Sequence, residues 1–182
     1  MADFKKAKMK TLQWEGGISN HKEDVGGLTF AGVAENFWGE KYPGIFSRLK
    51  EIISQTNGSA KEINKIAFAD ETFLNEIEKF YIDNFWNLIK GDEIIDQDKA
   101  QALFDYSVNS GVSRAVRDAQ EVCGVVVDGK LGPKTIEAIN NKTDFTNALC
   151  DRRTKFLEEA AKKGSNAKFL KGWLNRVNDF YV

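Results

Sequence analysis

Residues 13–29 read Gln-Trp-Glu-Gly-Gly-Ile-Ser-Asn-His-Lys-Glu-Asp-Val-Gly-Gly-Leu-Thr, and this stretch divides two kinds of sequence pattern. Before it, apolar residues fit an initial helix that the first glycine pair is expected to end. From Gly16 to Gly32 the chain has five glycines and no helical period. This segment predicts a short β-hairpin or an irregular lobe, which is too short for a full sheet.

The remainder of the chain is predicted to be helical, because its apolar residues recur at helical spacing. Turn signals at 56–58, at Gly91 and at 109–111 are expected to end helices, and Ser113 is expected to cap the next one. The last two helices are expected to run from residue 143 or 144 to Lys163, with Gly164 as a stop, and over 169–177. The predicted fold class is therefore mainly α, with a small lobe near residues 16–32.

The charge is close to balanced over the whole chain but differs between its halves. The 182 residues carry a formal net charge of −1, which favours no nucleic-acid partner. Residues 1–96 have a net charge of −4 and residues 97–182 a net charge of +3. The basic half is either solvated surface or a face that meets an acidic polymer. A boundary is predicted near residues 91–98, between two halves that pack together as one compact unit.

The composition also limits where the protein can act. Its two cysteines, Cys123 and Cys150, make no disulfide framework and are expected to be buried free thiols. No stretch approaches the roughly 20 apolar residues of a membrane span, and no signal peptide is recognised at the start. We expect synthesis in the cytoplasm, with any export assisted by other factors.

Two carboxylates in residues 13–29 have the properties of a general acid and of an ionised carboxylate that works with it. Glu15 falls at a helix end, where the helix dipole and the neighbouring Trp14 favour the protonated form that a general acid needs. Asp24 lies in a polar, glycine-rich segment that keeps a carboxylate ionised, and the hydroxyl of Thr29 is suited to holding a water. Glycoside hydrolysis uses such a pair. From spacing alone, a solvated glutamate and a turn aspartate remain the alternatives.

The motifs of this segment resemble those of glycoside hydrolase family 108, a family of peptidoglycan hydrolases. Glu-Gly-Gly at 15–17, Asp-Val-Gly-Gly-Leu-Thr at 24–29 and then Gly32 follow the family's pattern, and the Glu–Asp–Thr layout is similar to that of phage-type lysozymes. Further segments resemble the family's second module, a peptidoglycan-binding region: 104–111, 127–135 and 169–177. One departure is Phe-Ala at 30–31, where a smaller polar residue or one with an aromatic hydroxyl is expected.

The resemblance implies a lysozyme-like helical fold and an N-acetylmuramidase-like activity on the β-1,4 bond of peptidoglycan. It implies that Glu15 is the proton donor, and we assign Asp24 and Thr29 to the water or to the developing charge, with inversion favoured. Residues 1–96 are then the catalytic region and 97–182 the binding region. The expected partner is the peptidoglycan glycan strand, and the protein is expected to be a monomer without cofactor or metal.

Other candidate residues carry two interpretations each. Asn109 suits either an N-acetyl group or a helix cap, and Trp86 suits either a sugar face or the core, like Trp38. The single histidine, His21, has no partners for a metal site and is expected to be exposed.

A second hypothesis from another class is a non-catalytic wall-binding or secretion accessory protein. The basic half supports it, because peptidoglycan carries peptide carboxylates. If the chain is an enzyme, both a phage endolysin released through a holin, which causes bacteriolysis, and a secretion-associated bacterial hydrolase fit the sequence. Either would act in the periplasm or cell wall.

Overall fold

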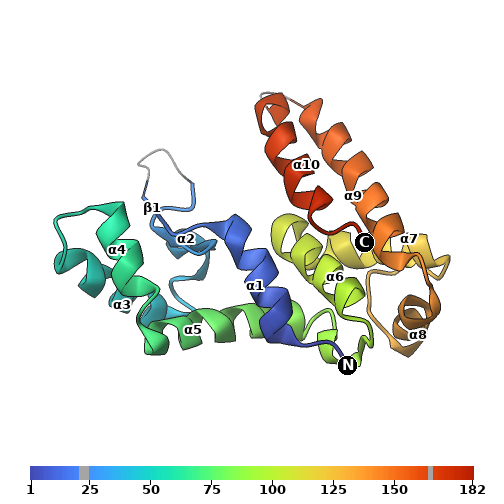
Figure 1. The fold of residues 1–182 in the computed structure, drawn as a ribbon, viewed down its shortest axis with the longest axis horizontal. Coiled ribbons are helices and arrows are strands. Elements are labelled where there is room, and N and C mark those ends of the chain that lie inside the picture. The colour runs from blue at the N-terminus through green and yellow to red at the C-terminus, as the bar shows by residue number, and fades with distance from the viewer. Residues whose placement is uncertain (21–24, 164–165) are drawn as a thin grey trace. The chain divides into compact units, whose positions relative to one another are not determined.

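The computed structural model describes residues 1–20, 25–163 and 166–182 (Figure 1). The chain forms two compact units, of which one contains residues 12–83 and the other residues 1–11 together with 84–182. His21 and Asp24 lie outside the described residues, as does Gly164. The functional division at residue 96 stays a prediction, because a compact unit is defined by packing alone.

The small lobe near residues 16–32 is confirmed as an antiparallel sheet. In the described residues it has three strands in the order β1 (Ile18–Ser19), β2 (Thr29–Phe30) and β3 (Val33–Ala34). Ile18 pairs with Phe30, and Phe30 pairs in turn with Val33. Phe30 and Val33 are fully buried and lie on the same face as paired residues, so the sheet turns one apolar face to its unit.

Helices form the rest of the first unit. The last four residues of α1 (Phe4–Glu15) belong to this unit. Four helices follow the sheet: α2 (Glu35–Trp38), α3 (Pro43–Ser54), α4 (Ala60–Ala67) and α5 (Glu71–Tyr81). Phe30 lies 5.1 Å from Phe68 and 5.0 Å from Phe73 between ring centroids, which joins the sheet to the helices. Asp70 caps α5 by accepting the N–H of Phe73 at 3.0 Å.

The second unit is built around α6 (Gln97–Ser110), whose residues from 99 to 107 are all buried. A π-helical turn (η1, Ile82–Trp86) and a 3₁₀ turn (η2, Gly91–Glu93) lead to α6. The other elements are α7 (Val112–Cys123), α8 (Pro133–Asn141), α9 (Phe145–Ala161), η3 (Asn166–Phe169) and α10 (Leu170–Asn178). Figure 1 shows α9 and α10 lying alongside each other.

The mainly α fold class is confirmed, but some helix limits differ from the prediction. The apolar stripe that begins at Phe73 does not continue as one α-helix, because α5 ends at Tyr81 and the π-helical turn follows. Ser113 lies inside α7, whose N-cap is Gly111 with a φ of +89°, a backbone conformation that favours glycine. None of the described helices is both long and apolar enough to cross a membrane.

The cysteine prediction is confirmed for one of the two residues. Both are free thiols, and Cys150 is buried, which raises its pKa to about 11. Cys123 is only half-buried.

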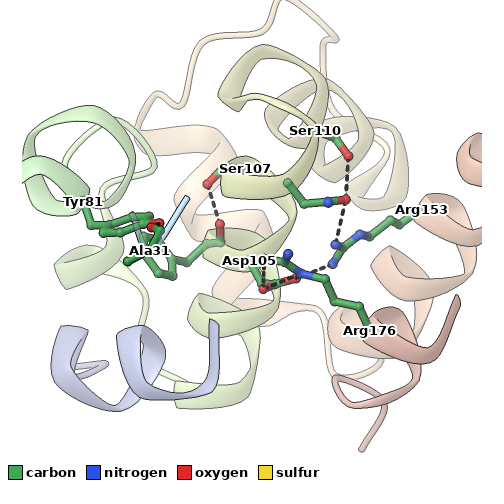
Figure 2. A network of polar contacts seen from close by, with 9 residues as sticks. Ala31, Tyr81, Asp105, Ser107, Ser110, Arg153 and Arg176 are labelled. Atoms are coloured by element: carbon green, nitrogen blue, oxygen red, sulfur yellow. Dashed lines mark hydrogen bonds and ion pairs between the residues drawn. The ribbon is translucent and has the colours of Figure 1, made fainter. Parts of the chain in front are cut away.

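A buried ionic cluster joins three helices of the second unit, and the sequence analysis did not predict it. Figure 2 shows the carboxylate of Asp105 on α6 between the guanidinium groups of Arg153 on α9 and Arg176 on α10. Arg153 donates to it at 2.7 Å, and Arg176 donates through two nitrogens at 2.8 to 3.1 Å. Asp105 is fully buried and both arginines are nearly so, hence each charge depends on the others for its solvation.

We predict that Asp105→Asn destabilises the second unit strongly, because two buried guanidinium groups lose their carboxylate. The expected loss is about 3–5 kcal/mol of unfolding free energy. Asp144→Asn is the control, because Asp144 is exposed and its ion pair with Lys142 at 2.9 Å should change the stability little. Chemical denaturation of both variants checks this, and an equal effect would contradict it.

Candidate active site

The carboxyl group of Glu15 is placed by the end of α1. Glu15 is the last residue of that helix, and Gly16 ends it with a φ of +72°, the left-handed conformation typical of a helix C-terminus. The side chain of Glu15 is half-buried. The first glycine after the acid therefore ends the helix and turns the chain into β1.

The carboxyl group lies against the turn between β2 and β3. This two-residue turn has positive φ at both Ala31 (+47°) and Gly32 (+75°), as in a type I′ hairpin. A Cβ added to Gly32 would lie 2.5 Å from Oε2 of Glu15 and 2.9 Å from the hydroxyl oxygen of Tyr81. The missing side chain at residue 32 thus leaves the room that the acid occupies.

Tyr81 fixes the same turn from α5. Its side chain is 1% exposed, and its hydroxyl donates a hydrogen bond to the carbonyl oxygen of Ala31 at 2.5 Å (Figure 2). The acid, the turn and this hydroxyl therefore meet at one point of the first unit. The sequence analysis missed Tyr81, because it occurs within an apolar stripe that indicates only a buried helix face.

Asn64 on α4 holds the backbone that follows the acid. Its side-chain oxygen accepts the N–H of Ile18 at 2.8 Å, and any side chain at Gly17 would collide with its amide. The second glycine after Glu15 is thus explained by close packing. The carbonyl oxygen of Gly17 in turn accepts the N–H of Ala31 at 3.3 Å.

Thr29 lies in β2, within the same unit as Glu15. Its hydroxyl donates to the carbonyl oxygen of Gly27 at 3.2 Å, so the hydroxyl oxygen can still accept a hydrogen bond from another group. The side chain of Asn36 holds the glycine pair at 26–27 from its other side, because its NH₂ group donates to the carbonyl oxygen of Val25 at 2.8 Å.

The other two candidate residues, Asn109 and Trp86, belong to the second unit. The side-chain oxygen of Asn109 accepts from Arg153 at 3.0 Å and from Ser110 at 3.1 Å, and Asn109 lines a cavity of about 220 Å³ with Phe156 and Trp173. Because Arg153 also donates to Asp105, this hydrogen bond links Asn109 to the buried ionic cluster.

Trp86 packs inside the second unit. The ring is 2% exposed, its N–H donates to Asp92 at 2.9 Å, and Phe4 and Phe104 pack against it edge-on. This placement agrees with the core interpretation of Trp86. Among the described residues, no group of three histidine, cysteine or acidic side chains could hold a metal ion.

Comparison with known proteins gives matches over nearly the whole chain. The family model for glycosyl hydrolase 108 matches residues 9–111, and the model described as "Predicted Peptidoglycan domain" matches residues 114–178. The chain is similar to a solved structure entitled "Structure of Brucella abortus SagA", at 28% identity and a TM-score of 0.69. That match covers 97% of this chain and 90% of the other. The search of curated proteins finds no match.

The contact between residue 32 and the acid generates a prediction. Gly32→Ala should lower peptidoglycan hydrolysis by about 10²-fold, because the carboxyl group must move by about 1 Å to make room and then loses its alignment. It should also cost roughly 1–2 kcal/mol, because alanine is unfavourable at positive φ.

Gly58→Ala is the matched control, because Gly58 has a φ of +77° in the same unit and open space around it. It should show the stability loss and keep the activity. Equal activity of the two variants would contradict a role for the Gly32 contact in placing Glu15.

Proposed function

The chain belongs to the glycosyl hydrolase 108 family, and from this premise we propose the reaction that it performs. The family makes it a lysozyme-like peptidoglycan hydrolase, and the second matched domain makes peptidoglycan its partner. We propose that it is an N-acetylmuramidase, which cuts the β-1,4 bond between N-acetylmuramic acid and N-acetylglucosamine by general acid catalysis.

The observation that carries this proposal is the placement of the Glu15 carboxyl group. It lies at a helix end against Gly32 and near the Tyr81 hydroxyl, so the backbone and a buried side chain restrict the positions that it can take. A general acid must present its proton to one oxygen of the substrate, and such fixing supports that task. Glu15 is proposed to protonate the glycosidic oxygen as the bond breaks.

Asp24 and Thr29 are proposed to act on the other face of the sugar. Asp24 either activates a water or stabilises the positive charge that develops on the ring. Thr29 helps to position the water, because its hydroxyl donates a hydrogen bond to Gly27 and its oxygen is left to accept a hydrogen bond from the water.

Asn109 is proposed as a substrate contact through its amide nitrogen. Its oxygen is already engaged by Arg153 and Ser110, which leaves the NH₂ group as the donor for an N-acetyl carbonyl oxygen. The neighbouring Trp173 offers an apolar ring beside the same cavity. Trp86 has no part in the proposal, because its ring is enclosed in the core.

The proposed place of action is the bacterial cell wall. We also propose that the protein is a monomer and that it reaches the wall by assisted release, as a phage endolysin does through a holin. Bacteriolysis is then the outcome of its activity.

The test is the loss of turbidity of purified Gram-negative sacculi. Glu15→Gln keeps the shape of the side chain but removes its titrating proton, and we expect clearing to fall by about 10²-fold or more. Glu40→Gln is the control, because Glu40 is an exposed glutamate of the same unit and should leave clearing unchanged.

Of three further results, the first and the third would count against the proposal. Equal clearing by the native protein and Glu15→Gln would mean that another group is the acid. Loss of clearing in both glutamate variants would point to folding. Sedimentation of the native protein with sacculi that it never clears would favour the non-catalytic binding protein.

The stereochemical outcome is the finer part of the proposal, and we expect inversion. Inverting glycosidases place a water between two carboxyl groups about 6.5–9.5 Å apart, whereas retaining enzymes hold them at about 5–5.5 Å. Proton NMR of the first product from a soluble muropeptide should show the α-anomer. A β-anomer as the first product would contradict inversion.

A further inference from the structure

A cavity of about 770 Å³ lies in the second unit, beyond the residues proposed for catalysis. Its lining residues belong to the end of α7, the following loop and the start of α8. Figure 1 shows where these two helices lie. Its volume is within the range of sites that bind small ligands. The whole cavity lies in the segment that matches the peptidoglycan domain.

Hydrogen bonds from two side chains of α7 fix the loop at residues 127–130, which forms one wall of the cavity. The side chain of Gln120 is 1% exposed, and its NH₂ group donates to the carboxylate of Asp128 at 2.8 Å and to the carbonyl oxygen of Lys130 at 3.0 Å. Its oxygen accepts the N–H of Gly129 at 2.8 Å. Arg117 also donates to the carbonyl oxygen of Val127 at 3.2 Å. A site fixed in this way loses little conformational entropy on binding.

The lining combines aliphatic surface with two cations. Val125, Val126 and Pro133 supply the apolar contacts, and Val126 is 79% exposed. Lys130 and Lys134 are both exposed and also line the cavity. None of the described lining residues is aromatic, although aromatic rings are the usual partners of sugar faces.

The single carboxylate in the lining, that of Asp128, is engaged within the loop. The N–H of Lys130 donates to it at 2.8 Å, and Gln120 donates to the same oxygen. These hydrogen bonds lower the pKa of Asp128 below its ordinary value. The carboxylate is thus held within the loop, and the lining carries two lysine charges against this single negative charge.

We propose that this cavity binds the peptide stem of peptidoglycan rather than its glycan strand, an inference that rests on the proposed function. The stem carries several carboxylates and the methyl groups of alanine residues, which complement two lysines and an aliphatic lining. The second unit then recognises the peptide, while the residues around Glu15 act on the sugar.

The test is isothermal titration of the full chain with a free stem tetrapeptide, L-Ala-γ-D-Glu-meso-diaminopimelate-D-Ala. The native protein should bind it, and added salt should weaken binding. The double variant Lys130→Gln, Lys134→Gln should bind about tenfold more weakly, as expected for the loss of two exposed ion pairs. Val126→Glu should also weaken binding, because it adds a negative charge that repels the carboxylates of the peptide at an exposed position.

Lys155→Gln is the matched control, because it removes one exposed charge from the same unit outside the cavity. Its affinity should equal that of the native protein. Circular dichroism of each variant confirms that the fold is retained.

The outcomes separate this inference from the proposed function. Glu15→Gln should keep its affinity for the stem peptide even though it fails to clear sacculi. Absence of stem binding by a native protein that clears sacculi would overturn the inference alone. Displacement of the peptide by peptide-free glycan strands, or unchanged affinity in the double lysine variant, would overturn it as well.

Discussion

The carboxyl group of Glu15 occupies the space that a side chain at Gly32 would need, and this close approach constrains the sequence of the first unit at several places. It requires a helix that ends directly after the acid, a turn with positive φ at two residues, and a helix that brings a buried hydroxyl to that turn. Each requirement restricts the sequence at a different place: glycine after the acid, glycine in the turn and tyrosine in α5. If Glu15 is the proposed acid, the confinement of its carboxyl group by these elements contributes to electrostatic preorganisation.

The second unit satisfies a different constraint. Its central helix carries a fully buried aspartate, and the arginines of α9 and α10 must pack against it for their charges to be neutralised. The side chain of Asn109 is attached to this cluster, so the charged core and the proposed substrate contact share one set of hydrogen bonds. Between α7 and α8, the buried side chain of Gln120 likewise fixes the loop that lines the larger cavity, through hydrogen bonds to Asp128 and Gly129.

Much of this could be predicted from sequence, and the limits have physical causes. The helix end at Glu15 and the lobe were predictable because glycine acts locally. Tyr81 was missed and Trp86 kept two interpretations, since periodicity gives the buried face of a helix but not what that face contacts. The partners of Asp105 lie 48 and 71 positions away, a distance that spacing rules do not reach. A charged residue between Phe104 and Tyr106 was the available signal, because a carboxylate among buried aromatic residues requires a cation.

The most direct test of the central claim compares two leaving groups in the Glu15→Gln variant. A dinitrophenyl glycoside of the peptidoglycan disaccharide needs no proton to depart, whereas the natural sugar does. If Glu15 is the general acid, the variant should hydrolyse sacculi at least about 10²-fold more slowly than the native protein and release dinitrophenol at a rate within about tenfold of it. An equally large loss on both substrates would contradict the account, because it would show that Glu15 serves some purpose other than protonating the leaving oxygen.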